Sequence, residues 1–319
     1  MFKATIIGNT SWGNTLASLL ASNRLTVNLW ARNPDEAREV NERGLCYYAT
    51  SDIKEALYGA TLALWVVPSQ SLRRNVSLAS KYLEPSMLLI SAAKGLEIDS
   101  GKRMSQVIVD EVTPAFGKHV CALSGPNLAK EVAQGLPAAA MIASEDIAIA
   151  ERARDLISSP KFLLFPTSDI TGVELGGALK NIVALGAGMI DGLGLGDNAK
   201  AAFVTWSWNE VISLGTALGA KIETFYGLAG LGDFVATCVS NLSRNHHVGF
   251  ELAKGRSLKE ITDSMSQVAE GVHTAMAIHK LIPKLNLRTP IINYIYQVLF
   301  ENLPAKEALA DFSNLTINR

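Results

Sequence analysis

Three charged residues lie in segments where they could carry acid–base chemistry. Lys180 lies in VELGGALKNIVALGAGMIDGLGLG, where glycines and alanines precede and follow it at helical spacing. Such small neighbours allow a ligand or another helix to approach, and partial loss of water would lower the lysine pKa toward the range useful for proton transfer. Asp233 follows a glycine-rich turn, GLAGLGD, and could position an ammonium group or a substrate hydroxyl. Lys94, in SAAKGLE, follows an apolar segment and could reach a phosphate or a carbonyl.

Each of these three residues also has a purely structural interpretation. Lys180 could extend its ammonium group to water from a closely packed helix. Lys94 could be a surface lysine, and Asp233 could be the N-cap of a helix. The residue types alone leave both interpretations open.

One segment near the N-terminus has the pattern of a dinucleotide-binding turn. The segment GNTSWG follows an apolar strand and opens a helix. Gly8 and Gly13 stand at the first and third glycine positions of the motif. Thr10 stands at the second position, where its side chain could crowd a phosphate or donate a hydrogen bond to it. Ser11 and the amides behind it offer an anion site at the helix N-terminus. A merely structural strand–helix turn is the alternative.

A second segment, SRN, also suits a phosphate group. Ser243 is a candidate N-cap, and Arg244 and Asn245 lie in the first helical turn, so a hydroxyl, a guanidinium, an amide and N–H groups meet at one helix end. His246 and His247 are adjacent and therefore point to different helix faces. The sequence contains no metal-ligand spacing.

Arg32 bears on the choice of cofactor. It stands in LWARN, at the end of the second apolar segment, where an NAD-binding enzyme would place Asp or Glu. Its guanidinium could pair with a 2′-phosphate, and no carboxylate stands there to repel that phosphate. The sequence therefore favours NADP, or both cofactors, over NAD alone. A solvated surface arginine is the alternative.

The elements that would position these residues divide the chain in two. In the first half, apolar segments alternate with helical patterns, which predicts an α/β domain with a doubly wound, mainly parallel sheet and a ligand site beyond the strand carboxyl ends. From about residue 170 the pattern is helical, with a capping box at Ser257 and Glu260. We therefore expect a Rossmann-like domain over 1–170 and an all-α domain over 171–319. Strands are predicted at 4–7, 26–31, 61–68, 87–94 and 119–125, and helices at 12–22, 34–43, 172–190, 197–218, 243–254, 257–265, 270–283, 288–302 and 304–310.

Composition excludes several classes of function. The net charge is −1, with 29 basic and 30 acidic residues, so the charge pattern of a nucleic-acid-binding protein is missing. The three cysteines, Cys46, Cys121 and Cys238, form neither a disulfide framework nor a zinc motif. Charges and glycines interrupt the least polar stretch, residues 175–196, so no membrane span is expected. The chain enters a predicted strand within its first two or three residues, so no signal peptide is expected. We expect a cytoplasmic protein.

Together, these motifs resemble those of the bacterial-type NAD(P)-dependent glycerol-3-phosphate dehydrogenases over nearly the whole chain. The resemblance implies an N-terminal Rossmann domain, an all-helical C-terminal domain and catalysis in the cleft between them. The matching segments are GxxSWG at 8–13, LWARN at 29–33, PS at 68–69, AKGLE at 93–97, SGP at 124–126, GALKNIVA at 177–184, GLAGLGD at 227–233, SRN at 243–245 and VAEG at 268–271.

The resemblance also implies a role for each matching residue. The implied catalytic residues are Lys180 as proton donor and acceptor, Lys94, and Asp233 beside the lysines. The implied substrate-binding residues are Lys94, Gly125, Asn127, Lys180, Asp233, Ser243, Arg244 and Asn245. The implied cofactor-binding residues are Gly8, Thr10, Ser11, Trp12, Gly13, Arg32, Lys94, Ala129, Arg244, Val268 and Glu270.

The activity that the resemblance implies is the reversible reduction of dihydroxyacetone phosphate to sn-glycerol 3-phosphate by NADPH or NADH, feeding glycerophospholipid synthesis, in a homodimer. Three positions depart from the family pattern: Thr10 replaces the second glycine, Asn127 replaces Ser or Thr, and Trp206 in TWSWNE replaces an arginine. Two alternatives are a related two-domain dehydrogenase of another small phosphate or hydroxy acid, and a catalytically silent nucleotide-binding sensor.

Overall fold

The computed structural model describes residues 2–239, 243–265 and 267–309 and contains two compact units. The first unit comprises Met1–Lys94 and Arg103–Glu174, and the second comprises Gly95–Lys102 and Leu175–Arg319. The short Gly95–Lys102 segment belongs to the second unit, whereas the expected boundary after residue 170 places it in the first domain. Within the second unit, Lys280 Nζ donates to the carbonyl oxygen of Ile98 at 3.3 Å.

The first unit contains one eight-stranded sheet with the strand order β3-β2-β1-β4-β5-β6-β7-β8. All neighbouring strands are parallel except β6 and β7. The predicted doubly wound, mainly parallel sheet is therefore confirmed. Its elements are β1 (Lys3–Ile7), α1 (Ser11–Ser22), β2 (Thr26–Trp30), α2 (Pro34–Glu42), β3 (Tyr48–Thr50), α3 (Ile53–Leu57), β4 (Leu62–Trp65), η1 (Ser69–Ser71), α4 (Leu72–Ser80), β5 (Leu88–Ser91), α5 (Met104–Glu111), η2 (Pro114–His119), β6 (Val120–Ser124), α6 (Ala129–Ala133), β7 (Ala138–Ala143), α7 (Ile147–Ile157) and β8 (Phe162–Thr167).

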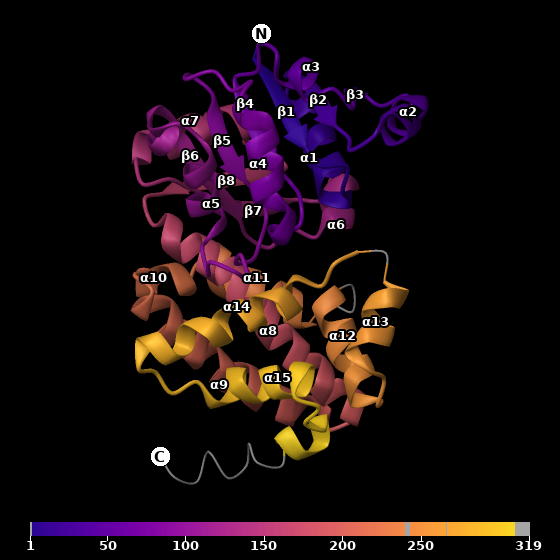
Figure 1. Ribbon diagram of the computed structural model, residues 1–319, viewed down its shortest axis with the longest axis vertical. Helices are drawn as coiled ribbons and strands as arrows, with labels where there is room; N and C mark the ends of the chain where they lie inside the picture. Colours follow the sequence, from indigo (N-terminus) through magenta and orange to yellow (C-terminus); the bar gives the residue numbers. More distant parts are fainter. Residues whose placement is uncertain (1, 240–242, 266, 310–319) are drawn as a thin grey trace. The chain divides into compact units, whose positions relative to one another are not determined.

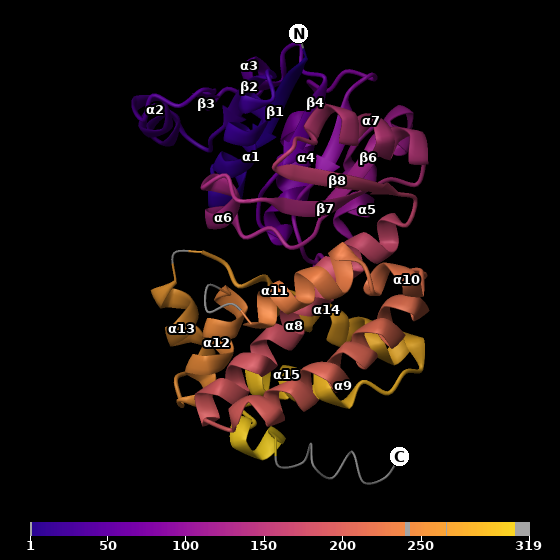
Figure 2. The ribbon, with the colours of Figure 1, turned by 180° about the vertical axis from the view of Figure 1, so that it is seen from behind.

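Helices cover both faces of this sheet (Figure 1). Successive strand side chains point to opposite faces, so Ile6 packs in one apolar cluster with α1 and α7, whereas Ile7 packs in another with α3, α4 and α5. The central strands β4 and β5 are buried throughout, as expected for parallel strands covered on two sides. Figure 2 shows α7 and β8 from the opposite side.

Three strands were not predicted from the sequence. β3 has only three residues, β7 is rich in alanine, and β8 contains Pro166. Alanine has a low preference for strands, and proline is tolerated chiefly at sheet edges, which is where β8 lies. Each of these strands forms because a neighbouring strand offers its backbone, which is a tertiary effect.

From Leu175 onward, the described part of the second unit is helical, as predicted. Its apolar cluster is built around α8, whose first five residues belong to the first unit. Residue 310 of the predicted helix 304–310 lies outside the described residues. The elements are α8 (Ile170–Leu193), α9 (Gly196–Ala217), α10 (Ile222–Phe225), a π-helical turn η3 (Leu228–Gly232), α11 (Asp233–Val239), α12 (Arg244–Ala253), α13 (Leu258–Ser264), α14 (Glu270–Leu285) and α15 (Pro290–Phe300), followed by a helical turn at 305–309.

Helix α8 packs unusually closely against α12. A Cβ atom on Gly188 would lie 2.0 Å from the carbonyl oxygen of His246, and one on Gly249 would lie 1.8 Å from that of Leu185. Glycine at these positions lets the two backbones touch. By length and hydropathy α8 could cross a membrane, but its most apolar window is 100% buried inside the protein.

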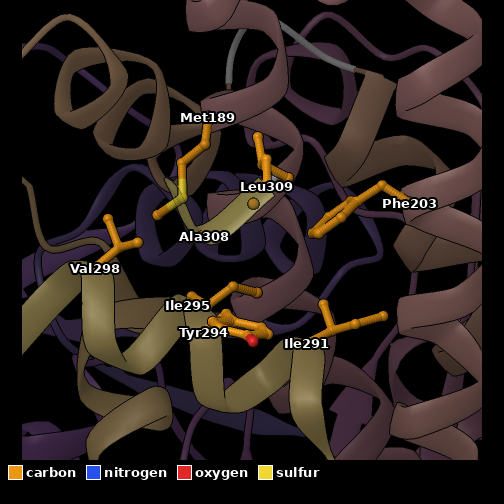
Figure 3. A pocket seen from close by; sticks show the side chains of 9 residues that line it. Met189, Phe203, Ile291, Tyr294, Ile295, Val298, Ala308 and Leu309 are labelled. Atoms are coloured by element: carbon orange, nitrogen blue, oxygen red, sulfur yellow. The ribbon is translucent and has the colours of Figure 1, made fainter. Parts of the chain in front are cut away.

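A small apolar cavity lies within the second unit, between α8, α9, α15 and residues 305–309. Its volume is about 20 Å³, room for roughly one water molecule. Figure 3 shows the lining side chains of Met189, Phe203, Ile291, Tyr294, Ile295, Val298, Ala308 and Leu309. The cavity is a packing void and is too small for a substrate.

Candidate active site

Gly8 and Gly13 shape the turn between β1 and α1. Gly8 has a φ of +128°, and a Cβ atom there would lie 2.6 Å from the carbonyl oxygen of Val66. A Cβ atom on Gly13 would lie 2.2 Å from the carbonyl oxygen of Gly8. Both distances are far below van der Waals contact, so a side chain at either position would displace backbone.

Thr10 caps α1. Its Oγ1 accepts a hydrogen bond from the N–H of Gly13 at 2.9 Å and donates one to the carbonyl oxygen of Val66 at 3.0 Å. The hydroxyl proton is therefore used within the turn. It is not available for the hydrogen bond to a phosphate that the sequence left open. Thr10 ties the turn to the end of β4. The exposed Ser11 and the first amides of α1 stand at the helix N-terminus, where the helix dipole attracts anions.

Trp12 and Ala129 both contribute to packing around α1. The half-buried Trp12 ring meets the Phe162 ring edge to face, with centroids 6.1 Å apart. Ala129 is the first residue of α6, and its carbonyl oxygen accepts a hydrogen bond from Thr15 Oγ1 at 3.3 Å. The α6 N-terminus is thereby held beside the helix that begins at the glycine turn.

Arg32 lies just beyond β2 and is strongly exposed. Its guanidinium donates to Glu36 of α2 over a distance of 3.0 Å, and 82% of its side chain is accessible. The expectation that no carboxylate stands beside Arg32 is therefore wrong, because the first turn of α2 places the Glu36 carboxylate next to it. The guanidinium still faces solvent, where an anionic group could reach it.

Lys94 follows β5 and contacts the loop after β6. Its Nζ donates to the carbonyl oxygen of Gly125 at 2.9 Å. A Cβ atom on Gly125 would lie 2.8 Å from Ala140 Cα, so the loop passes close to β7 because this residue is glycine. Among the described residues, the buried amide nitrogen and oxygen of Asn127 have no hydrogen-bond partner. A buried amide of this kind is suited to binding a polar ligand group.

In the second unit, Lys180 and Asp233 form a buried ion pair. Lys180 Nζ lies 2.6 Å from Asp233 Oδ1, and only 6% and 3% of the two side chains are exposed. Lys180 also donates to Thr237 Oγ1, and Thr237 in turn donates to the carbonyl oxygen of Asp233 at 2.7 Å. Burial opposes both charges, but each charge stabilises the other at this distance. The structure therefore contradicts the alternative in which Lys180 extends its ammonium group to water.

The small residues around Lys180 explain how Asp233 reaches it. A Cβ atom on Gly176, one turn before Lys180, would lie 2.6 Å from the carbonyl oxygen of Ala229. Glycine at this position lets the π-helical turn Leu228–Gly232 press against α8, and Asp233 follows that turn directly. Single π-helical turns are frequent at functional sites.

The SRN segment forms the N-terminus of α12, as predicted. Ser243 is the N-cap, with its Oγ accepting from the N–H of His246 at 3.3 Å. The amide of Asn245 is buried: its Nδ2 donates to Asn181 Oδ1 and its Oδ1 accepts from the N–H of Gly271, both at 2.9 Å. Asn245 thus connects α8, α12 and α14, and Asn181 is the neighbour of Lys180.

Arg244 connects the same helix start to the segment before α14. Its Nη1 donates to the carbonyl oxygen of Val268 at 3.0 Å. Burial lowers the pKa of the guanidinium, and the Glu270 carboxylate opposes that change. The structure thus brings Arg244, Val268 and Glu270, three predicted cofactor contacts, into one region of the second unit.

A further polar cluster holds the first turn of α12. His246 Nε2 lies 2.7 Å from Asp191 Oδ2, and Lys200 Nζ lies 2.8 Å from the same oxygen. Burial acts to raise the pKa of Asp191, but the hydrogen bonds from Lys200 and His246 outweigh it, so the pKa is lowered. No sequence motif pointed to a role for these three residues.

The two tryptophans of TWSWNE have different environments. Trp206 is 36% exposed on α9, whereas Trp208 is buried and packs on Phe234, with ring centroids 4.2 Å apart. Phe234 follows Asp233 directly. Trp208, rather than the departure at Trp206, therefore supports the helix that carries the buried carboxylate.

Comparisons with known proteins agree over nearly the whole chain. The N-terminal and C-terminal family models of NAD-dependent glycerol-3-phosphate dehydrogenase match residues 3–150 and 169–310. A glycerol-3-phosphate dehydrogenase [NAD(P)+] of Dehalococcoides mccartyi is 49% identical, covering 97% of this chain and 89% of that protein. One from Geobacter metallireducens is 42% identical, covering 97% and 96%.

A solved structure shows the same fold. The crystal structure of glycerol-3-phosphate dehydrogenase from Coxiella burnetii superimposes with a TM-score of 0.92 at 31% identity, covering 100% of this chain and 99% of that one. This agreement covers the sequence of both units. The chain belongs to the NAD(P)-dependent glycerol-3-phosphate dehydrogenase family of enzymes.

Proposed function

We propose that this protein reduces dihydroxyacetone phosphate to sn-glycerol 3-phosphate, reversibly, with NADPH or NADH. The observation that carries the proposal is the buried pair Lys180–Asp233, at 2.6 Å, in a member of this family. A buried lysine held by a carboxylate is a means of moving a proton to or from a carbonyl oxygen. A sensor that had lost catalysis would have no need to retain this costly buried pair.

The residues of the first unit fit a dinucleotide. The close contacts at Gly8 and Gly13 keep the turn free of side chains, and the α1 N-terminus offers amides to a pyrophosphate. Arg32 would meet the adenosine ribose end. The other cofactor contacts proposed in the first unit are Thr10, through the turn it builds, Ser11, Trp12, Lys94 and Ala129. Those proposed in the second unit are Arg244, Val268 and Glu270. When bound, the reduced nicotinamide supplies the hydride.

The residues of the second unit supply the proton and hold the phosphate. In the proposed reaction the substrate carbonyl carbon gains a hydride, and its oxygen gains a proton from the Lys180 ammonium group. Asp233 and Thr237 fix the position of that ammonium group. Ser243, Arg244 and Asn245 at the α12 N-terminus would bind the substrate phosphate and thereby fix the reacting carbon.

Two polar groups of the first unit are also proposed to bind the substrate. Lys94, held by Gly125, would bring positive charge to the substrate, and the unpartnered Asn127 amide would bind a polar group of it. We further propose that the enzyme works in the cytoplasm as a homodimer and supplies glycerophospholipid synthesis; light scattering of the purified protein tests the dimer.

The experiment that tests the function is direct. Purified protein is mixed with dihydroxyacetone phosphate and either NADPH or NADH, and nicotinamide absorbance is followed. We expect oxidation that depends on the substrate, and none with dihydroxyacetone, which lacks the phosphate. Absence of oxidation with both cofactors would overturn the proposal.

A further inference from the structure

We propose that Glu36 sets the balance between NADPH and NADH by neutralising Arg32. The proposal rests on the cofactor role proposed above for Arg32 and adds a second residue that selects between the two cofactors. It concerns only the first unit, at the end of β2.

Glu36 is held beside Arg32 by several donors. Its Oε1 lies 3.0 Å from Arg32 Nη2 and 3.1 Å from Asn33 Nδ2, and its Oε2 lies 3.4 Å from the N–H of Arg32. In return, the N–H of Glu36 donates to Asn33 Oδ1 at 2.9 Å. Asn33 is thus the N-cap of α2, and its side chain and the Glu36 side chain bind each other at the helix start. The carboxylate position is therefore fixed by the fold of the helix end.

The exposures of the two partners differ. The Arg32 side chain is 82% exposed, whereas the Glu36 side chain is 25% exposed. The guanidinium is thus the partner that solvent and a ligand can reach, and the carboxylate is the less accessible one. An anion that binds Arg32 approaches a fixed negative charge.

This arrangement affects the two cofactors differently. NADPH carries a 2′-phosphate that must compete with Glu36 for the guanidinium and is repelled by its carboxylate. NADH has a 2′-hydroxyl at that position and is not repelled. Glu36 therefore weakens NADPH binding relative to NADH. Its carboxylate lies near the end of β2, although the residue at the strand end itself is Arg32.

The test is the substitution Glu36→Gln, with dissociation constants of NADPH and NADH measured by fluorescence on the whole protein without substrate. The N-cap bond from the N–H of residue 36 to Asn33 does not depend on the side chain at 36, and a glutamine oxygen can still accept from the N–H of Arg32, so the helix end is preserved. We expect NADPH to bind about three- to tenfold more tightly and NADH to change by less than about twofold, since the repelling charge is gone but the site is partly exposed. Raised salt should reduce the difference.

Two controls separate this effect from others. Glu39→Gln removes the same charge from an exposed position of α2 and should leave the NADPH to NADH ratio unchanged. In an Arg32→Ala background, Glu36→Gln should change the ratio much less than in the parent. An unchanged ratio in Glu36→Gln, or an equal change in Glu39→Gln, would overturn the role of Glu36. If the parent binds neither cofactor, it is the proposed function that fails.

Discussion

The ion pairs Arg32–Glu36 and Lys180–Asp233 are similar in chemistry but not in surroundings. Their N–O distances are 3.0 and 2.6 Å, yet the side chains are 82% and 25% exposed in the first pair and 6% and 3% exposed in the second. An exposed pair contributes little to stability and is easily exchanged for another partner. A buried pair is costly to break, because each charge then lies in the interior without its counterion. We infer that the first pair adjusts cofactor affinity and that the second carries out the chemistry.

The largest expected effect is that of Lys180→Ala. It removes the proposed proton donor, so kcat should fall by about 10²–10⁴-fold while the dissociation constant of the cofactor stays within about twofold. Steady-state kinetics and fluorescence titration measure the two quantities. The matched control is Lys259→Ala, a lysine that is 85% exposed and pairs with Asp263 at 2.5 Å. Retained turnover in Lys180→Ala would contradict the assignment of the proton donor.

Asp233→Ala tests how much the buried ion pair contributes to stability. It leaves the Lys180 ammonium group without its carboxylate, so the free energy of unfolding should fall by about 3–5 kcal/mol, and turnover should fall with it. Urea denaturation measures the stability. Asp263→Ala breaks the exposed pair and should change stability by no more than about 0.5 kcal/mol. Equal losses in the two variants would show that burial does not distinguish the pairs.

Arg32→Ala tests the exposed pair. NADPH should bind about tenfold more weakly, because a charge-assisted contact to the 2′-phosphate is lost, whereas NADH affinity should stay within about twofold. Titration of each cofactor checks the difference. An equal loss for both cofactors would remove the proposed 2′-phosphate role.

The smallest expected effect is that of Thr10→Gly. It removes the two hydrogen bonds that tie the turn to Gly13 and Val66 and should weaken both cofactors equally, by about two- to tenfold. Thr10→Ser keeps a hydroxyl and should restore most of the affinity. Tighter binding in Thr10→Gly would instead mean that the threonine side chain crowds the pyrophosphate.

Strands β1, β2, β4, β5 and β6, helices α1 and α2, and most helices of the second unit could be predicted because their apolar patterns are local. The strand Ala138–Ala143 could not, since its alanines carry no strand preference and its pairing partners are distant in sequence. Likewise, the sequence indicates that Asp233 could pair with a lysine but does not show the contact. The ion pair with Lys180 depends on the close approach of the π-helical turn to α8 at Gly176.

Two residues missed in the sequence do have local signals. Thr237 lies four positions after Asp233, so a helix places both on one face. Glu36 lies three positions after Asn33, which is the spacing of a capping box. The cluster of Asp191, Lys200 and His246 has no such signal, because its members come from three different helices.

The most direct test of the two-pair account is a single-turnover experiment. Parent, Arg32→Ala and Lys180→Ala, each saturated with NADH, are mixed rapidly with excess dihydroxyacetone phosphate, and nicotinamide absorbance is recorded. We expect nicotinamide oxidation in Arg32→Ala at the parent rate and in Lys180→Ala about 10²–10⁴-fold more slowly. A parent-like rate in Lys180→Ala, or an equal slowing of both variants, would contradict the two-pair account.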